Sequence, residues 1–399
     1  MIKSMASPII SAPKREKDPK KRVVITGMGL VSVIGSDVDM FYDKLLAGES
    51  GVTLIDNFDA SDLPVKIAGK IRDFSADGYI DANEHKHIDN VTKFCLVAGK
   101  KALQSADLGL EVLKRLDRTR IGALVGSGVG GASTFAAGTQ AYYEQGLKAV
   151  SPFMVPNYLS NVGSAKLAID AGFMGPTYAI AAACATSNYN ICAAANHIRK
   201  GEADIIVAGG TEAAVIRHCI AGFIACRALS HRNDEPEKAS RPWDKGRDGF
   251  VMSEGCGLLV MESLDHAIKR EANIIAEYLG GALVCDAYHF TEPHPDGLGV
   301  SACIAKALQN AGVSPEEVNY VNAHATSTQA GDLAEVIAIK KVFKNTSEMK
   351  MNATKNLEPE VTIDTIPNKK KEHQVNVAIS NAFGFGGQDS VVVFAPFLP

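Results

Sequence analysis

Several features that mark special classes of protein are missing from this sequence of 399 residues. No apolar run is long enough to cross a bilayer, so we expect no membrane-spanning helix and a soluble globular protein. The formal net charge is -4, and no run of Lys and Arg is interleaved with aromatic residues, so a nucleic-acid partner is not expected. The eight cysteines lie singly, without a CxxC pair or zinc-type spacing, which argues against a disulfide framework and against a metal site.

The sequence is rich in residues that fill an interior. Hydrophobic residues make up 46% of it, and 399 residues exceed what one simple core uses, so two domains or two fused halves are expected. Residues 1–21 differ in character, because their first part has no acidic residue and three serines and their second part, PKREKDPKKR, is a charged linker. We interpret residues 1–21 as either an organelle-targeting remnant or a disordered tail.

Short apolar runs alternate with longer helical patterns from Arg22 onward, which is typical of an α/β protein. The expected strands end in glycine or polar turns and read RVVITG, IGALVG, DIIVAGG, GLLVMES, IIAEYLGG, VNYVNAH, QVNVAIS and SVVVFAP. A charged segment near residues 262–280 divides the chain, and we predict one half at 22–275 and a second half at 276–399. Residues 345–371 contain no run able to form a buried helix, although parallel strands need a covering crossover.

Cys184 is the cysteine with the most reactive surroundings. It lies among small residues in AIAAACATSN, between a strand expected at 178–182 and an Ala-rich helix expected over 185–200. A thiol at a helix N-terminus feels the positive end of the helix dipole, which lowers its pKa and favours the nucleophilic thiolate. The alternative is a small buried core residue, which is the commoner fate of cysteine.

Two further segments place polar or glycine-rich turns directly after expected strands. His324 in NAHATST has the position of a general base or hydrogen-bond donor, although a loop histidine is more often an ordinary surface residue. In NAFGFGGQD, Gly384 and Gly386 allow backbone amides to approach a ligand and form an oxyanion hole, and Phe385 between them has the place of a movable apolar gate. The alternative for this segment is a glycine hairpin with one packed phenylalanine.

Two other features carry less weight. GSGVGG, with Gly126, Gly128 and Gly131, satisfies the GxGxxG spacing, but no acidic residue follows at the interval that dinucleotide binding requires. The Lys-rich stretches at 340–371, Lys355 included, are most simply solvated surface.

Taken together and in order, five motifs resemble the β-ketoacyl-acyl-carrier-protein synthase family, and especially its plant plastid type I members: ITGMGLVSVIG, ACATSN, RPWDKGRDGFVMSEG, NAHATST and NAFGFGG. The resemblance implies a thiolase-like αβαβα layered fold of two related halves and a homodimer. It also implies a place in fatty acid biosynthesis in the plastid (chloroplast stroma). No bound cofactor is implied, because the substrates arrive on the phosphopantetheine of acyl carrier protein, which is the expected partner.

The resemblance also implies roles for individual residues. Cys184 would carry the acyl chain as a thioester, and an enolate formed by loss of carbon dioxide from malonyl-ACP would attack it to give a 3-oxoacyl product. The backbone amides of Cys184 and Phe385 would form the oxyanion hole, and His324 would donate to the malonyl thioester oxygen. Lys355 occupies the position of the family's catalytic lysine.

The chain departs from the family directly after Lys355. Family members continue with a Gly-His pair, whose histidine is catalytic, and then with a buried helix rich in Gly and Ala, whereas here MNATK runs into NLEPEVTIDTIPN. We therefore expect the second half to lack one buried helix and the site to lack one histidine, for which His373 is a weak substitute because it precedes a strand. Three functions stay open: an active condensing enzyme, a catalytically impaired paralogue or splice form that binds acyl carrier protein or an intact synthase, and a Cys-His thioester hydrolase.

Overall fold

The computed structural model describes residues 15–347, 349–352, 357, 359, 361–366 and 370–398, and its centre is one eleven-stranded mixed sheet. The first part of the chain contributes the strands β1 (Val23–Val31), β4 (Ile121–Gly126), β5 (Thr177–Tyr178), β6 (Ile205–Glu212) and β7 (Gly255–Ser263). The second part contributes β8 (Ala276–Cys285), β9 (Tyr320–Asn322), β10 (Lys350–Asn352), β11 (Asp364–Ile366), β12 (Ala378–Gly384) and β13 (Gln388–Ala395). Each of the eight apolar runs expected to form a strand overlaps one of these strands.

The order of the strands shows that the chain contains the same arrangement twice. The sheet runs β11-β10-β9-β12-β13-β8-β1-β7-β6-β4-β5, so β1-β7-β6-β4-β5 and β8-β13-β12-β9-β10 repeat one pattern. In each set, two antiparallel pairs are followed by two parallel pairs. The sets join where β1 pairs antiparallel with β8. The two related halves are therefore confirmed, whereas their boundary between residues 275 and 276 stays a prediction.

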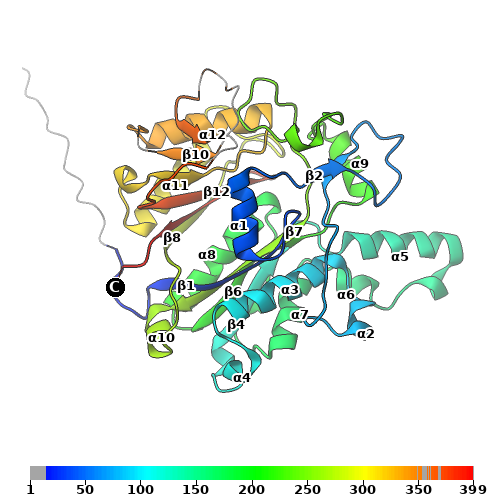
Figure 1. Cartoon of the computed structure of the whole chain (residues 1–399), viewed down its shortest axis with the longest axis horizontal. Coiled ribbons are helices and arrows are strands. Elements are labelled where there is room, and N and C mark those ends of the chain that lie inside the picture. The colour runs from blue at the N-terminus through cyan, green and yellow to red at the C-terminus, as the bar shows by residue number, and fades with distance from the viewer. Residues whose placement is uncertain are drawn as a thin grey trace, which may run out of the picture.

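The helices follow the same repeat with one exception. The first half has α3 (Asn90–Ser105), α7 (Val162–Ala171) and α8 (Thr186–Arg199), and the second has α11 (Leu298–Ala311) and α12 (Gln329–Val342) in the places of α3 and α7. In Figure 1, α3 and α7 lie on one side of the molecule, α11 and α12 on the opposite side, and α8 between them. The described residues between β10 and β12 contain no counterpart of α8, and β11 extends the sheet there instead. Within this described part of the second half, the predicted loss of one buried helix is confirmed.

Helix α8 is central because its apolar face packs against both halves. Its buried residues between Ile191 and Ile198 form one core cluster with residues of β6 and with Val392 of β13. Asn188 adds a polar link, since its Nδ2 donates to Ser380 O in β12 over 3.1 Å. Many side chains of this helix are small. Strands from both halves can therefore approach it closely.

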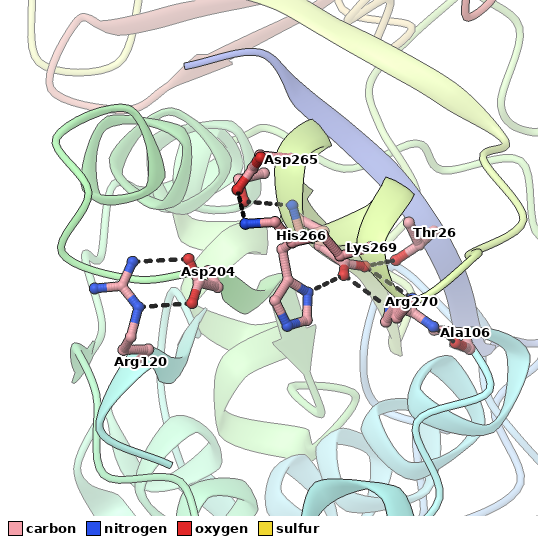
Figure 2. A network of polar contacts seen from close by, with 10 residues as sticks. Thr26, Ala106, Arg120, Asp204, Asp265, His266, Lys269 and Arg270 are labelled. Carbon is pink, nitrogen blue, oxygen red and sulfur yellow. Dashed lines mark hydrogen bonds and ion pairs between the residues drawn. The ribbon is translucent and has the colours of Figure 1, made fainter. Parts of the chain in front are cut away.

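The charged segment between the halves is fixed by a buried network (Figure 2). Glu262, at the end of β7, is fully buried and accepts hydrogen bonds from Thr26 Oγ1 (2.9 Å), from Nε and Nη2 of Arg270 (2.8 Å each) and from His266. Arg270 Nη1 also donates to Ala106 O over 2.8 Å. Burial alone would raise the pKa of Glu262, but the hydrogen bonds from His266 and Arg270 lower it overall. The segment is a rigid connection and not a loose linker.

The other helices of the described chain surround this framework. They are α1 (Val38–Ala47), α2 (Ala82–His85), α4 (Leu110–Leu113), α5 (Ala132–Gln145), α6 (Met154–Tyr158), α9 (Arg217–Ala225) and α10 (Leu264–Lys269). Strands β2 (Val52–Leu54) and β3 (Ile67–Gly69) form a separate antiparallel pair. Among the residues that the structure describes, no helix is both long and apolar enough to cross a membrane.

Candidate active site

Cys184 lies at a sharp turn between β5 and α8. The turn is a 3-10 segment, η3 (Ala183–Ala185), and Ala183 has a φ of 45°, in the left-handed region that residues with a side chain rarely adopt. Thr186 Oγ1 holds this turn, because it accepts from Ala182 N (2.9 Å) and donates to Ala183 O (2.7 Å). Strain of this kind is typical of positions where the backbone must present a functional side chain.

The strand before this turn is shorter than expected. It ends at Tyr178 instead of residue 182. The side chain of Asn190 in α8 replaces a strand partner, since it donates to Ile180 O (2.9 Å) and accepts from Ile180 N (3.0 Å). Satisfying these backbone groups by a side chain leaves the chain free to turn toward α8.

The thiol of Cys184 differs from the sequence expectation in its pKa. Burial raises the pKa of Cys184, a hydrogen bond from its own amide lowers it, and the charge of Glu212 raises it further. The predicted lowering of this pKa by the helix dipole is therefore wrong in direction. Cys184 has accessible surface, but it lies in a cavity whose protein walls partly desolvate the thiol, which disfavours the charged thiolate.

His324 lies just beyond the end of β9, as expected. Burial lowers the pKa of His324 to about 4, although a hydrogen bond to the backbone of Phe383 opposes this effect. The two rings meet edge to face, with centroids 5.4 Å apart. The imidazole is therefore neutral near neutral pH, and it presents one nitrogen as a donor and the other as an acceptor.

A buried carboxylate that sequence reasoning missed holds the His324 loop in place. Glu335 of α12 is 1% exposed and accepts hydrogen bonds from the amides of His324 (2.9 Å) and Ala325 (2.8 Å) and from Asn381 Nδ2 in β12 (2.9 Å). Burial raises the pKa of Glu335 to about 7 despite these donors. The only signal for it in the sequence is an acidic residue among the apolar positions of this helix.

The RPWDKGRDGFVMSEG segment supports the same loop from the other side. Trp243 donates from its backbone amide to Asp332 Oδ2 (2.7 Å) and from Nε1 to Asp332 O (2.9 Å). Arg247 donates to Thr328 O (3.0 Å) and to Gln329 O (2.7 Å). These contacts fix the first turn of α12 and, through it, the loop that carries His324.

The glycine-rich segment is a tight hairpin between β12 and β13. A Cβ at Gly384 would lie 2.4 Å from Ala182 O, so only a glycine lets the hairpin touch the turn of Cys184. Phe385 at the tip packs near Phe223, with ring centroids 6.4 Å apart. The segment is thus a hairpin with a packed phenylalanine, and it also lies at the site.

One cavity of about 870 Å³ brings the expected residues together. Cys184, His324, Gly384 and Phe385 all line it. Gly386 differs from them, because its amide already donates to the carbonyl of the neighbouring loop residue Phe290 over 2.7 Å. Its amide is therefore not available for the oxyanion hole, for which the family resemblance names the amides of Cys184 and Phe385.

The GSGVGG segment also lines this cavity, which explains its glycines without a dinucleotide. Glu212 of β6 accepts hydrogen bonds from Ser127 Oγ (2.9 Å) and from the amide of Gly128 (2.8 Å). Burial raises the pKa of Glu212, and the hydrogen bonds of this loop oppose the rise. The loop is therefore a wall of the cavity, fixed by a buried carboxyl.

Two more residues were considered from the sequence. Lys355 lies outside the described residues. His373 pairs through Nε2 with Asn319 O over 3.0 Å and is not among the described residues that line the cavity.

Comparisons with known proteins agree with this geometry. Residues 20–267 match the family described as the β-ketoacyl synthase N-terminal domain, and residues 275–357 match the β-ketoacyl synthase C-terminal domain. The chain belongs to the β-ketoacyl synthase family. The match to the C-terminal domain stops two residues after Lys355, where the sequence departs from the family pattern.

Curated relatives in plants are highly similar over nearly the whole chain. The 3-oxoacyl-[acyl-carrier-protein] synthase I, chloroplastic, of Arabidopsis thaliana is 58% identical, and the alignment covers 99% of this chain and 91% of that protein. The barley (Hordeum vulgare) protein of the same name is 60% identical, with 98% and 92% covered. The Arabidopsis alignment extends over 430 residues, more than the 399 of this chain, so the relative has residues without a counterpart here.

Solved structures of synthases have the same fold. A β-ketoacyl synthase from Burkholderia phymatum superposes with a TM-score of 0.86 at 26% identity, covering 94% of this chain and 100% of the other. A ketosynthase in complex with the acyl carrier protein of a type II polyketide synthase gives 0.84 at 27% identity, covering 94% and 99%. The predicted thiolase-like layered fold is confirmed.

Proposed function

We propose that this protein is a 3-oxoacyl-ACP synthase that extends an acyl chain by decarboxylative condensation. The observation that carries the proposal is the shared cavity, in which the Cys184 thiol, the His324 imidazole and the Phe385 turn face one space. Relatives at 58% and 60% identity that bear this name support the reaction class.

The first half-reaction is transfer of the acyl group to Cys184. The thiol sulfur attacks the thioester carbonyl of acyl-ACP, its proton passes to the departing phosphopantetheine sulfur, and an acyl-cysteine forms. The amides of Cys184 and Phe385 donate to the carbonyl oxygen as it becomes negative, and loss of one such donor costs roughly 3–4 kcal/mol in the barrier. Burial raises the pKa of Cys184, so the thiol enters the reaction uncharged. The two amides therefore act on the negative charge that develops on the carbonyl oxygen during the attack.

The second half-reaction uses His324. The carboxylate of malonyl-ACP leaves as carbon dioxide, and the electron pair forms an enolate that attacks the acyl-cysteine and releases the Cys184 thiolate. His324 donates an N–H to the malonyl thioester oxygen as charge develops there. Its pKa of about 4 favours this role, because a neutral imidazole near pH 7 donates without bringing a buried positive charge. Lys355 occupies the sequence position of the family's catalytic lysine, and we assign it to this step on that resemblance alone.

The partners proposed are acyl carrier protein and a second copy of this chain. A relative of known structure is a ketosynthase bound to its acyl carrier protein. For the homodimer, β5 pairs only with β4 among the described strands and so forms a sheet edge. In the same half, α5 and α6 present Tyr143 (81% exposed) and Val155 (65% exposed). An unpaired sheet edge and exposed apolar side chains both favour association. Since the plant relatives are named chloroplastic, we also propose the plastid as the location.

The test begins with acylation. Incubation with acyl-ACP should add one acyl group to Cys184, detected by intact-protein and peptide mass spectrometry, and Cys184→Ala should abolish it. Cys219→Ala is the matched control, because Cys219 is another accessible thiol but does not line the cavity within the described chain. Malonyl-ACP should then convert the acyl-enzyme to 3-oxoacyl-ACP and carbon dioxide. Acylation of all cysteines alike, or release of free fatty acid in place of the 3-oxoacyl product, would contradict the proposal.

A further inference from the structure

Two carboxyl groups meet where the glycine hairpin touches the loop after β8. Asp389 is the second residue of β13, and Asp286 follows directly on β8. A Cβ at Gly299, in the first turn of α11, would lie 2.4 Å from Asp286 Oδ1 and 2.8 Å from Asp389 Oδ2. The two carboxylate oxygens are therefore no farther apart than the sum of these distances. Both residues also line the cavity of Cys184.

The hydrogen bonds of this pair leave one oxygen without a partner. Asp286 accepts from the amide of Gly299 through Oδ1 (3.0 Å) and from the amide of His294 through Oδ2 (2.5 Å). Asp389 is 3% exposed, and its Oδ2 is buried without a hydrogen bond. An ionised carboxylate in this state is costly, because it is unpaired and faces a second negative charge. A proton on Asp389 removes the repulsion and gives Asp286 a donor.

Among the residues that the structure describes, no positive charge shifts the pKa of Asp389. Burial first, and then the charge of Asp286, raise the pKa of Asp389 to about 7. The other titratable groups that interact with it are Tyr189 of α8 and Cys303 of α11, and the charge of Asp389 raises the pKa of both; Cys285 of β8 acts on Tyr189. The positive charge of Lys306 in α11 opposes the rise in the pKa of Cys303.

The acid pair lies beside two backbone hydrogen bonds that tie the loop to the hairpin tip. The amide of Asp286 donates to Gly387 O (2.7 Å), and the amide of Gly386 donates to Phe290 O (2.7 Å). Phe385, the residue before Gly386, lines the cavity. If the loop after β8 separates from the hairpin, these two hydrogen bonds break, and we expect Phe385 to move relative to Cys184.

We propose that Asp389, when protonated, is a positioning residue that shares its proton with Asp286 and so holds the turn of Phe385 over the Cys184 cavity. Loss of the proton to solvent leaves two facing carboxylates, which repel each other and open the turn. The proposal rests on the proposed roles of Cys184 and Phe385. It is tested by how readily a small reagent reaches the Cys184 thiol, and not by the rate of condensation.

The test compares the rate at which iodoacetamide alkylates Cys184 in the wild type and in Asp389→Asn, measured on the Cys184 peptide by mass spectrometry. Asparagine has the same shape and donates to Asp286 at every pH. The ratio of wild-type to variant rate cancels the ionisation of Cys184 itself. We expect this ratio to be near one at about pH 6 and to rise severalfold by about pH 8.5, as the acid pair ionises in the wild type alone.

A second variant and a control make the outcome specific. Asp286→Asn also removes the repulsion and should give the same rise in the ratio of wild-type to variant rate, whereas Asp296→Asn, at an exposed position of the same loop, should react like the wild type and give a ratio near one at every pH. A ratio that stays constant with pH for both Asp389→Asn and Asp286→Asn would overturn the proposal. Failure of Cys184 to react at any pH in the wild type would instead overturn the proposed function.

Discussion

Glu335 offers the sharpest test of how the site is held together. Its carboxylate is 1% exposed and accepts three hydrogen bonds, two of them from the loop that carries His324. Glutamine at this position has the shape of the protonated carboxyl group, with one accepting oxygen and one donating group. Glu335→Gln therefore reproduces the neutral form and removes only the ability to ionise.

The size of the effect follows from the pKa. Burial raises the pKa of Glu335 from 4.5 to about 7. Between these values the folded protein keeps a proton that the unfolded chain has lost, so stability is fully present below about pH 4.5 and falls as pH rises through about 7. At about 1.4 kcal/mol per unit, the loss amounts to about 3 kcal/mol. Glu335→Gln does not suffer this loss, so it should gain on the wild type by about 2–3 kcal/mol between pH 5 and pH 8.

The chain contains its own probe for this experiment. Trp243 is its single tryptophan, is 1% exposed and is bonded to Asp332 at the start of the same helix. Urea unfolding followed by Trp243 fluorescence at both pH values, at one protein concentration, gives the two free energies of unfolding. Glu316→Gln, at an exposed position, is the control and should follow the wild type. If Glu335→Gln and the wild type differ by the same amount at both pH values, the reasoning about this buried carboxyl is refuted.

Three further substitutions test the framework and the site. Glu262→Gln weakens the buried pair with Arg270, so we expect a loss of about 3 kcal/mol in thermal unfolding near pH 7; the loss should shrink as pH falls through the lowered pKa of Glu262. Gly384→Ala brings a Cβ to 2.4 Å from Ala182 O and should slow acylation of Cys184, while Gly222→Ala, with nothing within 4 Å, should not. Thr186→Val removes both hydrogen bonds of the hydroxyl at the Cys184 turn, so thermal unfolding should show a loss of about 1–3 kcal/mol; unchanged stability would contradict the role given to this turn.

Local patterns in the sequence were sufficient for eight strands and for α8, but not for β2, β3, β10 and β11 or for the end of β5. Alternation of apolar runs and turn residues gave the strands, and helical spacing placed α8 within one residue at each end of the expected range. These predictions succeed because strand and helix periods are properties of neighbouring residues. The absence of one helix could also be predicted, because residues 345–371 contain no run able to form a buried helix. The parallel strands on either side of this segment then lack the helix that would normally connect and cover them.

Distant residues decided the chemistry of the site. The helix dipole, a local effect, predicted a lowered pKa for Cys184, but the cavity walls and Glu212 come from other elements and raise it. Glu335, eleven positions beyond His324, became relevant only when α12 folded back on the loop.

The amino-acid order alone thus determined eight of the strands and helix α8, that the chain has two halves, and which thiol and imidazole follow a strand. Only the tertiary structure decided that both halves share one strand order, that Asp286 and Asp389 face each other, and how water exclusion sets each pKa. The physical reason is range: backbone preferences act between neighbours, whereas burial and charge act between residues that folding alone brings together.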